Sequence, residues 1–219
     1  MTHTPPSTLG PRATQKLQTR QALLQAVLRL TEHQSLGGLS LREVSRAAGI
    51  VPAGFYRHFP DMESLGVALV EQSLGGLRTA LRAVRVGLTE SDEIARRSVE
   101  VLAREVRAQR DQFRFISRER YGGMQRVRQA IHDQLRLISE ELATDLRSGD
   151  VTASSVLADW SEEDVRILTD MIVNHMTSTA AAIVDVPPGR PAVGHQVIAT
   201  ATTQLQLIIV GARHWLDPA

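Results

Sequence analysis

The sequence contains no cysteine. Disulfide bonds and cysteine-ligated zinc or iron–sulfur sites are therefore excluded, and the chain suits a reducing compartment such as the cytoplasm. No run of about 18 apolar residues is present, and the first 16 residues lack the apolar centre of a signal peptide. We therefore expect a cytoplasmic protein that neither crosses nor enters a membrane. Its 219 residues, 42% of them hydrophobic, suffice for a core of one large or two small domains.

Net charge is also small, at +1, but it is unevenly distributed along the chain. Residues 1–60 carry seven basic and two acidic side chains, whereas the remainder has an acidic excess of four. A positive end on a nearly neutral chain favours a polyanionic partner at that end. A solvated charged face gives the same pattern, so charge alone does not identify the partner.

Strand-like alternation is absent as well, whereas apolar residues recur at helical spacing of three and four. The sequence predicts an all-α fold of about nine helices, at about 14–34, 41–48, 52–58, 61–86, 92–110, 111–121, 124–147, 161–184 and 191–216. Ser40 and Glu43 have the spacing of a capping box, Ser161 begins a similar one, and Gly49 is expected to end the second helix. We expect a flexible arm at 1–13, one domain at 14–60 and another at 61–219.

Residues 41–58 have the pattern of a helix-turn-helix: a helix, a tight glycine turn and a short helix. A major groove about 12 Å wide admits one helix, and the preceding helix braces it against the DNA backbone. Phe55 and Phe59 are expected in the core. Simple packing remains an alternative for Tyr56 and His58. The candidate DNA contacts are Arg12, Lys16, Ser40, Arg42, Val51, Pro52, Ala53, Gly54, Tyr56, Arg57 and His58, of which Arg57 can pair with guanine in a bidentate manner.

The segments "LSLREVSRAAGI" and "FYRHFPDMESL" make residues 14–75 resemble the DNA-binding domain of the TetR family of bacterial repressors. Together with "FRFISRERYGG", they are similar to regulators of unsaturated fatty acid synthesis of the FabR and DesT type. The resemblance implies a three-helix DNA-binding domain, a C-terminal ligand-binding and dimerisation domain, and a homodimer on palindromic double-stranded DNA. It also implies a response to long-chain acyl-CoA. Val51, Pro52 and Met62 depart from the family pattern, and no phosphate contact is expected from Met62.

Eight arginines and three acidic residues lie between Arg104 and Arg128, beside several aromatic side chains. A cationic strip next to an apolar pocket suits an amphiphile with a phosphate-bearing head, because arginine pairs with phosphate. A solvated face with internal ion pairs is the alternative. Apolar stripes in 124–147 and 161–184 can form either a core or a cavity. The candidate effector residues are Phe113, Phe115, Ile116, Arg118, Arg120, Tyr121, Leu135, Ile138, Leu142, Ile172, His175 and Met176.

The last predicted helix has an apolar face too wide for one neighbouring helix to cover. If two subunits each contribute this helix and the helix at 161–184, the four helices form a seam that buries the apolar face. The resulting twofold dimer would bind a palindromic DNA site. Burial within one chain is the alternative. The candidate interface residues are Leu168, Ile198, Leu205, Ile208, Ile209, Ala212 and Trp215.

Catalytic motifs are missing: the seven histidines form no H-E-x-x-H, and there is neither G-x-S-x-G nor a paired-carboxylate motif. We therefore expect a regulator, not an enzyme, with no metal or cofactor. Two alternatives remain, a repressor that responds to another apolar ligand such as a drug or lactone, and a helical enzyme that acts on acyl thioesters.

Overall fold

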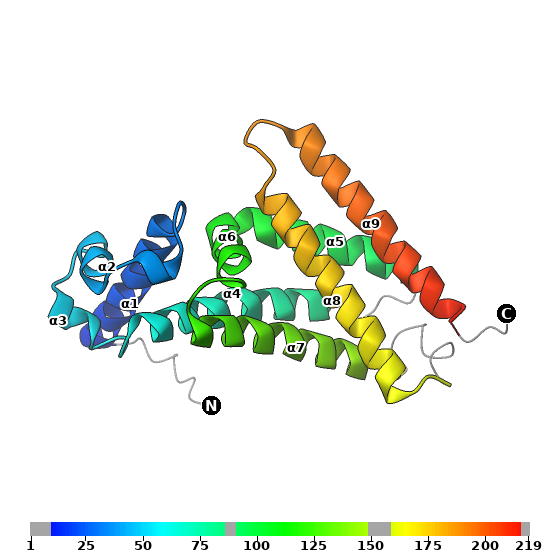
Figure 1. Cartoon of the computed structure of the whole chain (residues 1–219), viewed down its shortest axis with the longest axis horizontal. Coiled ribbons are helices and arrows are strands. Elements are labelled where there is room, and N and C mark those ends of the chain that lie inside the picture. Colours follow the sequence, from blue (N-terminus) through cyan, green and yellow to red (C-terminus); the bar gives the residue numbers. More distant parts are fainter. Residues whose placement is uncertain (1–9, 86–90, 149–158, 216–219) are drawn as a thin grey trace, which may run out of the picture.

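The computed structural model describes residues 10–85, 91–148 and 159–215, which contain nine α-helices, one short 3-10 helix and no strand (Figure 1). The all-α prediction is confirmed. Most of the expected arm, residues 1–9, lies outside the described residues. The elements are α1 (Pro11–Leu30), η1 (Leu36–Gly38), α2 (Leu41–Ala47), α3 (Pro52–Phe55), α4 (Met62–Arg85), α5 (Ser91–Ala108), α6 (Arg110–Glu119), α7 (Gln125–Arg147), α8 (Glu162–Val184) and α9 (Pro191–Arg213).

Helix boundaries differ from the prediction mainly at α1 and α3. Helix α1 begins three residues early because Pro11 occupies its first turn, where the missing N–H costs nothing. It ends at Leu30, and η1, which was not predicted, follows. Helix α3 has four residues and not seven, although Tyr56 keeps a helical backbone conformation as its C-cap.

The buried residues of the first three helices belong to one continuous core with those of the C-terminal helices. Phe55 is fully buried and Phe59 is 3% exposed, as predicted for core residues. The capping box of α2 is present: the Glu43 N–H donates to the Ser40 hydroxyl at 3.2 Å, and the Ser40 N–H donates to the Glu43 carboxylate at 2.8 Å. Gly49 has φ +73°, which places it in the left-handed region where glycine is favoured.

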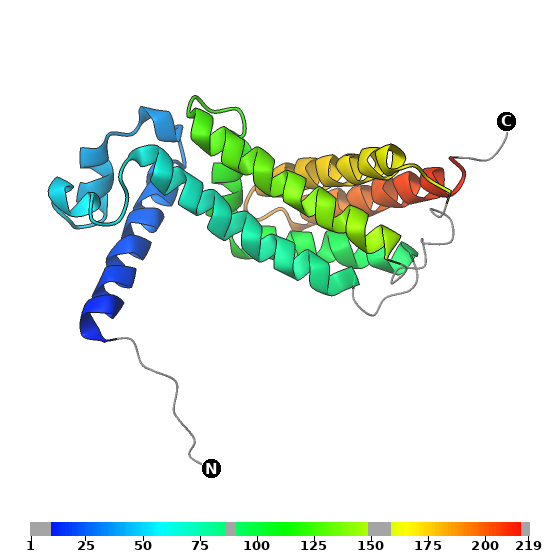
Figure 2. The same cartoon turned by 90° about the horizontal axis from the view of Figure 1, so that it is seen from below.

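Helix α4 runs out of this domain and lies along α7, while α8 and α9 lie together with α5 on the other side of the bundle (Figures 1 and 2). Within the described residues, α8 alone has the length and hydropathy of a membrane span, and 44% of that window is buried inside the chain. Burial of this kind is typical of a core helix, so composition gives weak evidence for a membrane segment.

Gly66 lets α4 approach η1 and α7 closely. A Cβ at this position would lie 2.6 Å from Leu36 Cδ2 and 2.7 Å from Val127 Cγ2, and both of those side chains are fully buried. Overpacking of this kind costs about 1–3 kcal/mol. At Gly76, also in α4, an added Cβ would have nothing within 4 Å of it.

We expect the free energy of unfolding of Gly66→Ala to lie about 1–3 kcal/mol below that of Gly76→Ala. Both variants gain the same helix propensity, so the difference reports the overpacking at Gly66. Urea denaturation of the two proteins measures the difference. Equal stabilities would contradict the close packing of α4 against η1 and α7.

Candidate functional site

The short helix α3 presents the predicted DNA contacts to solvent. Val51 is 70% and Tyr56 63% exposed, and Pro52, Ala53 and Arg57 are exposed beside them. Gly54 is half-buried. Large exposed apolar and aromatic side chains are costly to leave in water, so their position at the start and end of α3 suits contact with base edges and sugars. The Tyr56 ring contacts buried Phe55 edge-on, with 5.8 Å between ring centroids, and the exposed remainder of Tyr56 keeps it a candidate DNA contact.

Basic side chains extend this surface beyond α3. Arg12 and Lys16 are exposed on α1, and Arg42 is exposed on the first turn of α2. The Ser40 hydroxyl is occupied by the capping box with Glu43. Because the carboxylate accepts the Ser40 N–H, the pKa of Glu43 lies below its ordinary value. This surface therefore offers its cations to a polyanion, while Ser40 chiefly fixes the helix.

His58 is half-buried, and its Nδ1 is buried without a hydrogen-bond partner among the described residues. Burial lowers the pKa of His58, and the nearby charges of Lys16, Arg20 and Arg57 lower it further. The imidazole is consequently shifted toward its neutral form in the free protein. The arginines, and not His58, supply the positive field of this surface.

The C-terminal helices enclose an apolar cavity of about 280 Å³. Its walls come from α4 to α9, and among the described residues only Arg120 and Arg213 bring charge to its lining. Helices α4 and α5 contribute Leu74, Leu77, Leu81, Ile94, Ala95, Ser98 and Leu102. An apolar cavity with few polar groups is the usual form of a site for a small hydrophobic ligand.

The structure brings nine of the twelve predicted effector residues to this cavity: Phe113, Ile116, Arg120, Tyr121, Leu135, Ile138, Leu142, Ile172 and Met176. The prediction was wrong for the other three. Phe115 is 1% exposed and does not line the cavity, because it lies on another side of α6 from Phe113. His175 contacts the Ala201 carbonyl oxygen through Nε2 at 2.9 Å, and Arg118 faces the N-terminal domain.

The arginines of 104–128 do not form a continuous strip beside the cavity. Arg114 pairs with Asp111 at 3.1 Å, and Arg126 pairs with Asp61 at 3.0 Å. Arg128 donates to the Gly122 carbonyl oxygen. The alternative of internal pairing is therefore correct for much of this segment, and Arg120 is its one arginine that lines the cavity.

Helix α6 joins the cavity to the N-terminal domain. Phe113 and Ile116 line the cavity, while Arg118 donates from Nη1 to the Thr31 carbonyl oxygen at 3.0 Å and from Nη2 to that of Glu32 at 3.1 Å. These carbonyls follow the end of α1, where a cation is favourable. The Glu119 carboxylate, 1% exposed, accepts the Leu36 N–H at 2.8 Å. Arg118 and Glu119 thus tie α6 to the segment that follows α1 and to η1.

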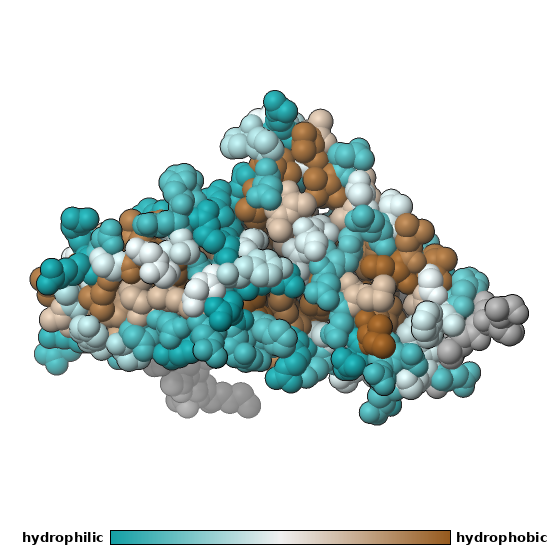
Figure 3. Space-filling view, in the orientation of Figure 1, coloured by the Kyte–Doolittle hydropathy of each residue, from teal (hydrophilic) through white to brown (hydrophobic). Residues whose placement is uncertain are grey.

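The outer surface of α8 and α9 carries a second apolar region of the molecule (Figure 3). Its exposed members are Ile167, Met171, Leu207, Val210 and Trp215, with exposures from 44% to 65%. Of the predicted interface residues, Leu168, Ile208, Ala212 and Trp215 line the shallow groove in this region.

Most of the surface of the other interface candidates, and of Leu168, is covered within one chain. Leu168 is 8% and Leu205 3% exposed in the isolated chain, so neither offers much surface to a partner. Ile198 packs half-buried against the main core, and Ile209 lines the apolar cavity. A single helix face cannot show which of its residues the other helices of the same chain cover.

Comparison with known proteins identifies the N-terminal domain. Residues 23–69 match the family model described as bacterial regulatory proteins, tetR family. The N-terminal part of the chain is thus similar to TetR-family regulatory proteins. The match covers the end of α1, the helix-turn-helix and the start of α4, which are the elements that position the exposed face of α3.

Solved structures share the fold of this chain along nearly its whole length. The fatty acid degradation regulator FadR from Bacillus halodurans is 16% identical, with a TM-score of 0.61, covering 97% of this chain and 100% of that one. FadR from Bacillus subtilis, in complex with stearoyl-CoA, is 16% identical with a TM-score of 0.60, covering 89% and 98%. GusR from Salmonella enterica is 18% identical with a TM-score of 0.68, covering 89% and 96%.

Several residues of the site were not predicted. The α4 and α5 lining residues carry the same helical apolar spacing as α7 and α8, so the signal was present but did not separate cavity from core. Glu119 had no such signal, because its partner is a backbone N–H 83 positions away in sequence. Within the described residues, no group of three His, Cys, Asp or Glu side chains could hold a metal ion.

Proposed function

We propose that this protein is a cytoplasmic TetR-type repressor whose homodimer binds a palindromic operator and whose operator affinity changes when a long-chain acyl-CoA enters the apolar cavity. In this proposal residues 14–60 bind DNA, residues 61–219 bind the effector and dimerise, and the regulated genes serve fatty acid metabolism, including the synthesis of unsaturated chains.

The position of α6 carries the proposal. One side of this helix lines the cavity through Phe113 and Ile116, and the other holds the end of α1 through Arg118 and η1 through Glu119. A ligand shifts an equilibrium only if it binds two conformations with different affinity. A chain in the cavity that favours one placement of α6 also favours one placement of the DNA-binding domain, and hence one spacing of the two α3 helices in the dimer.

The apolar lining supports an acyl chain as the effector. Leucine and isoleucine side chains from α4 to α9 surround the cavity, and the charged lining residues Arg120 and Arg213 lie at the ends of α6 and α9. The structures of FadR from two Bacillus species support the same ligand class, since one is described as a fatty acid degradation regulator and the other holds stearoyl-CoA.

The exposed apolar surface of α8 and α9 supports the dimer. Leu207 is 65% and Met171 50% exposed, and a second copy of these helices would remove both from water. We expect Leu207→Glu to be monomeric at concentrations where the wild-type protein is dimeric, because the seam would bury an unpaired carboxylate. Light scattering after size-exclusion chromatography measures the mass.

Gln72→Glu is the matched control, since Gln72 is exposed on α4, away from this surface. It adds the same charge and should leave the dimer intact. A Leu207→Glu protein that keeps the wild-type mass and helical circular dichroism would contradict a seam at this position.

Selection from randomised DNA duplexes tests the proposed function as a whole. The full-length protein is incubated with the library without effector, with palmitoyl-CoA, or with oleoyl-CoA, and bound duplexes are sequenced. The proposal predicts an enriched palindrome whose recovery changes with the thioester. An enriched palindrome indifferent to both thioesters would favour another apolar ligand, such as a drug or lactone. No enriched sequence would contradict the repressor, and thioester hydrolysis by the purified protein would then favour the enzyme.

A further inference from the structure

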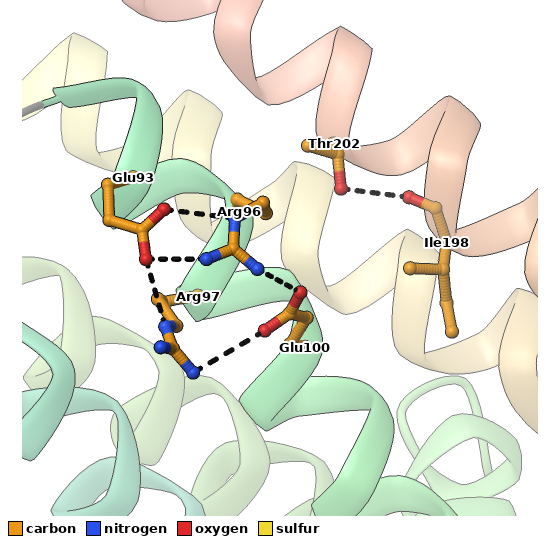
Figure 4. Close-up of polar contacts among 6 residues, drawn as sticks. All are labelled: Glu93, Arg96, Arg97, Glu100, Ile198 and Thr202. Atoms are coloured by element: carbon orange, nitrogen blue, oxygen red, sulfur yellow. Dashed lines mark hydrogen bonds and ion pairs between the residues drawn. The ribbon is translucent and has the colours of Figure 1, made fainter.

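Arginines of the C-terminal helices are often neutralised by neighbouring carboxylates. On α5, for example, Arg96 Nε donates to Glu93 at 2.9 Å and Arg97 Nε donates to Glu93 at 3.0 Å, with Glu100 contacting both arginines (Figure 4). Arg107 and Arg190 depart from this arrangement. Within the described residues, their side chains have neither a hydrogen-bond nor an ion-pair partner.

These two arginines line one pocket of about 400 Å³. Its lining residues come from the end of α5, the start of α6, the end of α8, the α8–α9 connection and the start of α9, and Figure 1 shows how these segments meet. Arg110 and His195 also line the pocket. No acidic side chain does, among the residues described. We call this pocket, with Arg107, Arg110, Arg190 and His195, the basic pocket.

Two further features raise its positive potential. The first turn of α9 lines the basic pocket and has no side-chain cap and no acidic residue. Pro191 has no N–H, and the Val193 and Gly194 N–H groups donate to the Arg190 carbonyl oxygen, so the positive contribution is that of the helix dipole. Gly194 lies in this turn, and a Cβ there would be 3.3 Å from Arg107 Nη2. The Arg107 guanidinium therefore lies against the first turn of α9, where a cation is unfavourable and a nearby anion would offset the repulsion.

Arg110 is held in place by the fold. Its Nη2 donates to the carbonyl oxygens of Val184 and Val186, each at 2.6 Å, while its Nε is buried and has no acceptor among the described residues. Arg110 thus fixes the α8–α9 connection and gives the basic pocket one rigid cation. Rigid, convergent donors favour the binding of phosphate oxygens, which accept several charge-assisted hydrogen bonds at once.

The basic pocket begins one helical turn beyond the apolar cavity. Leu102 of α5 lines the cavity and Val106 the basic pocket, and Ala180 and Ile183 of α8 are divided in the same way. One turn spans about 5.4 Å. A ligand with an apolar chain and a phosphate-bearing head can therefore reach both sites.

We propose that the basic pocket binds the phosphate groups of an anionic ligand. The phosphates belong either to the head of the acyl thioester whose chain fills the cavity, a source that rests on the proposed function, or to a separate phosphate compound. In both cases the side chains of Arg107 and Arg190 can reorient toward the phosphates, whereas Arg110 is held by its hydrogen bonds to the Val184 and Val186 carbonyl oxygens.

Isothermal titration of the full-length protein with pyrophosphate, coenzyme A, palmitoyl-CoA and palmitate tests the proposal. The main variant is Arg107→Gln/Arg190→Gln, with Arg190→Gln alone as a second variant that changes only an exposed loop position. Arg104→Gln controls for loss of an exposed α5 arginine outside the pocket, and Arg57→Gln controls for phosphate binding at the DNA surface.

Pyrophosphate or coenzyme A is expected to bind the wild type and both control proteins alike, and to bind the double variant about tenfold more weakly, through loss of charge-assisted hydrogen bonds. Weaker palmitoyl-CoA binding with unchanged palmitate binding would assign the phosphates to the effector head. Unchanged palmitoyl-CoA binding with weaker pyrophosphate binding would assign the phosphates to a separate compound.

Wild-type protein that binds neither pyrophosphate nor coenzyme A would overturn the proposal. A double variant that binds them as tightly as the wild type would also overturn it. Pyrophosphate binding without any palmitoyl-CoA binding would instead contradict only the proposed effector.

Discussion

Ser98→Trp is expected to weaken the response to acyl-CoA strongly while leaving operator binding intact. Ser98 is a half-buried residue of α5 that lines the apolar cavity, and none of the contacts that hold α6 to α1 includes it. An indole at this position occupies space that the acyl chain needs. Overpacking costs about 1–3 kcal/mol, so the palmitoyl-CoA concentration for a half-maximal response should rise about tenfold or more.

Fluorescence anisotropy of a labelled operator, titrated with thioester, measures this response. Gln72→Trp is the control, because Gln72 is exposed on α4 and lines none of the pockets described above. It introduces the same side chain and should respond as the wild type does. A Ser98→Trp protein that binds operator normally and still responds at the wild-type concentration would contradict the cavity as the effector site.

Arg57→Ala should produce the largest loss of operator affinity among single changes in the DNA-binding domain. Arg57 is exposed just after α3 and can pair with guanine through two hydrogen bonds. Loss of such a contact costs about 1–3 kcal/mol, or about 5- to 150-fold in dissociation constant. The variant should also discriminate less well at one base pair of each half-site, which measurements on single-base operator variants will detect.

Arg57→Lys distinguishes a base contact from a phosphate contact. Lysine keeps the charge but not the planar fork, so it should restore little affinity if Arg57 reads guanine. Full rescue by lysine, with unchanged discrimination among operator variants, would reassign Arg57 to a phosphate. Arg82→Ala, which removes an exposed arginine of α4, serves as the control for loss of general charge.

Local signals in the sequence were sufficient for much of the fold. The Ser40–Glu43 capping box, the left-handed Gly49 and the buried pair Phe55 and Phe59 all depend on interactions within a few residues, and the structure contains each of them. Helical periodicity likewise predicted α4 to α9 within a few residues at each end. The predicted ends of α1 and α3 were wrong, because tertiary packing and the unpredicted η1 determine where these helices end.

The candidate site was harder to predict because residues that line the cavity have the same residue types and spacing as core residues. The two differ only in whether another side chain or the cavity lies opposite them. Ile131 and Leu135 lie one turn apart on α7, yet Ile131 is 1% exposed in the core while Leu135 lines the cavity. The same holds for arginines: the sequence shows their number, but Arg118 reaches a carbonyl oxygen 86 positions away, and no periodicity encodes that distance. Pairing between remote elements is set by the tertiary fold.

The most direct test of the coupling between cavity and DNA surface is the operator dissociation constant of the wild-type dimer, measured at one salt concentration without and with saturating oleoyl-CoA. A typical allosteric coupling of about 1–3 kcal/mol predicts a change of about 5- to 150-fold. Such a change is expected in the wild type, whereas Ser98→Trp should need an oleoyl-CoA concentration about tenfold or more higher. An identical dissociation constant in both conditions, with oleoyl-CoA binding demonstrated by calorimetry, would contradict the coupling.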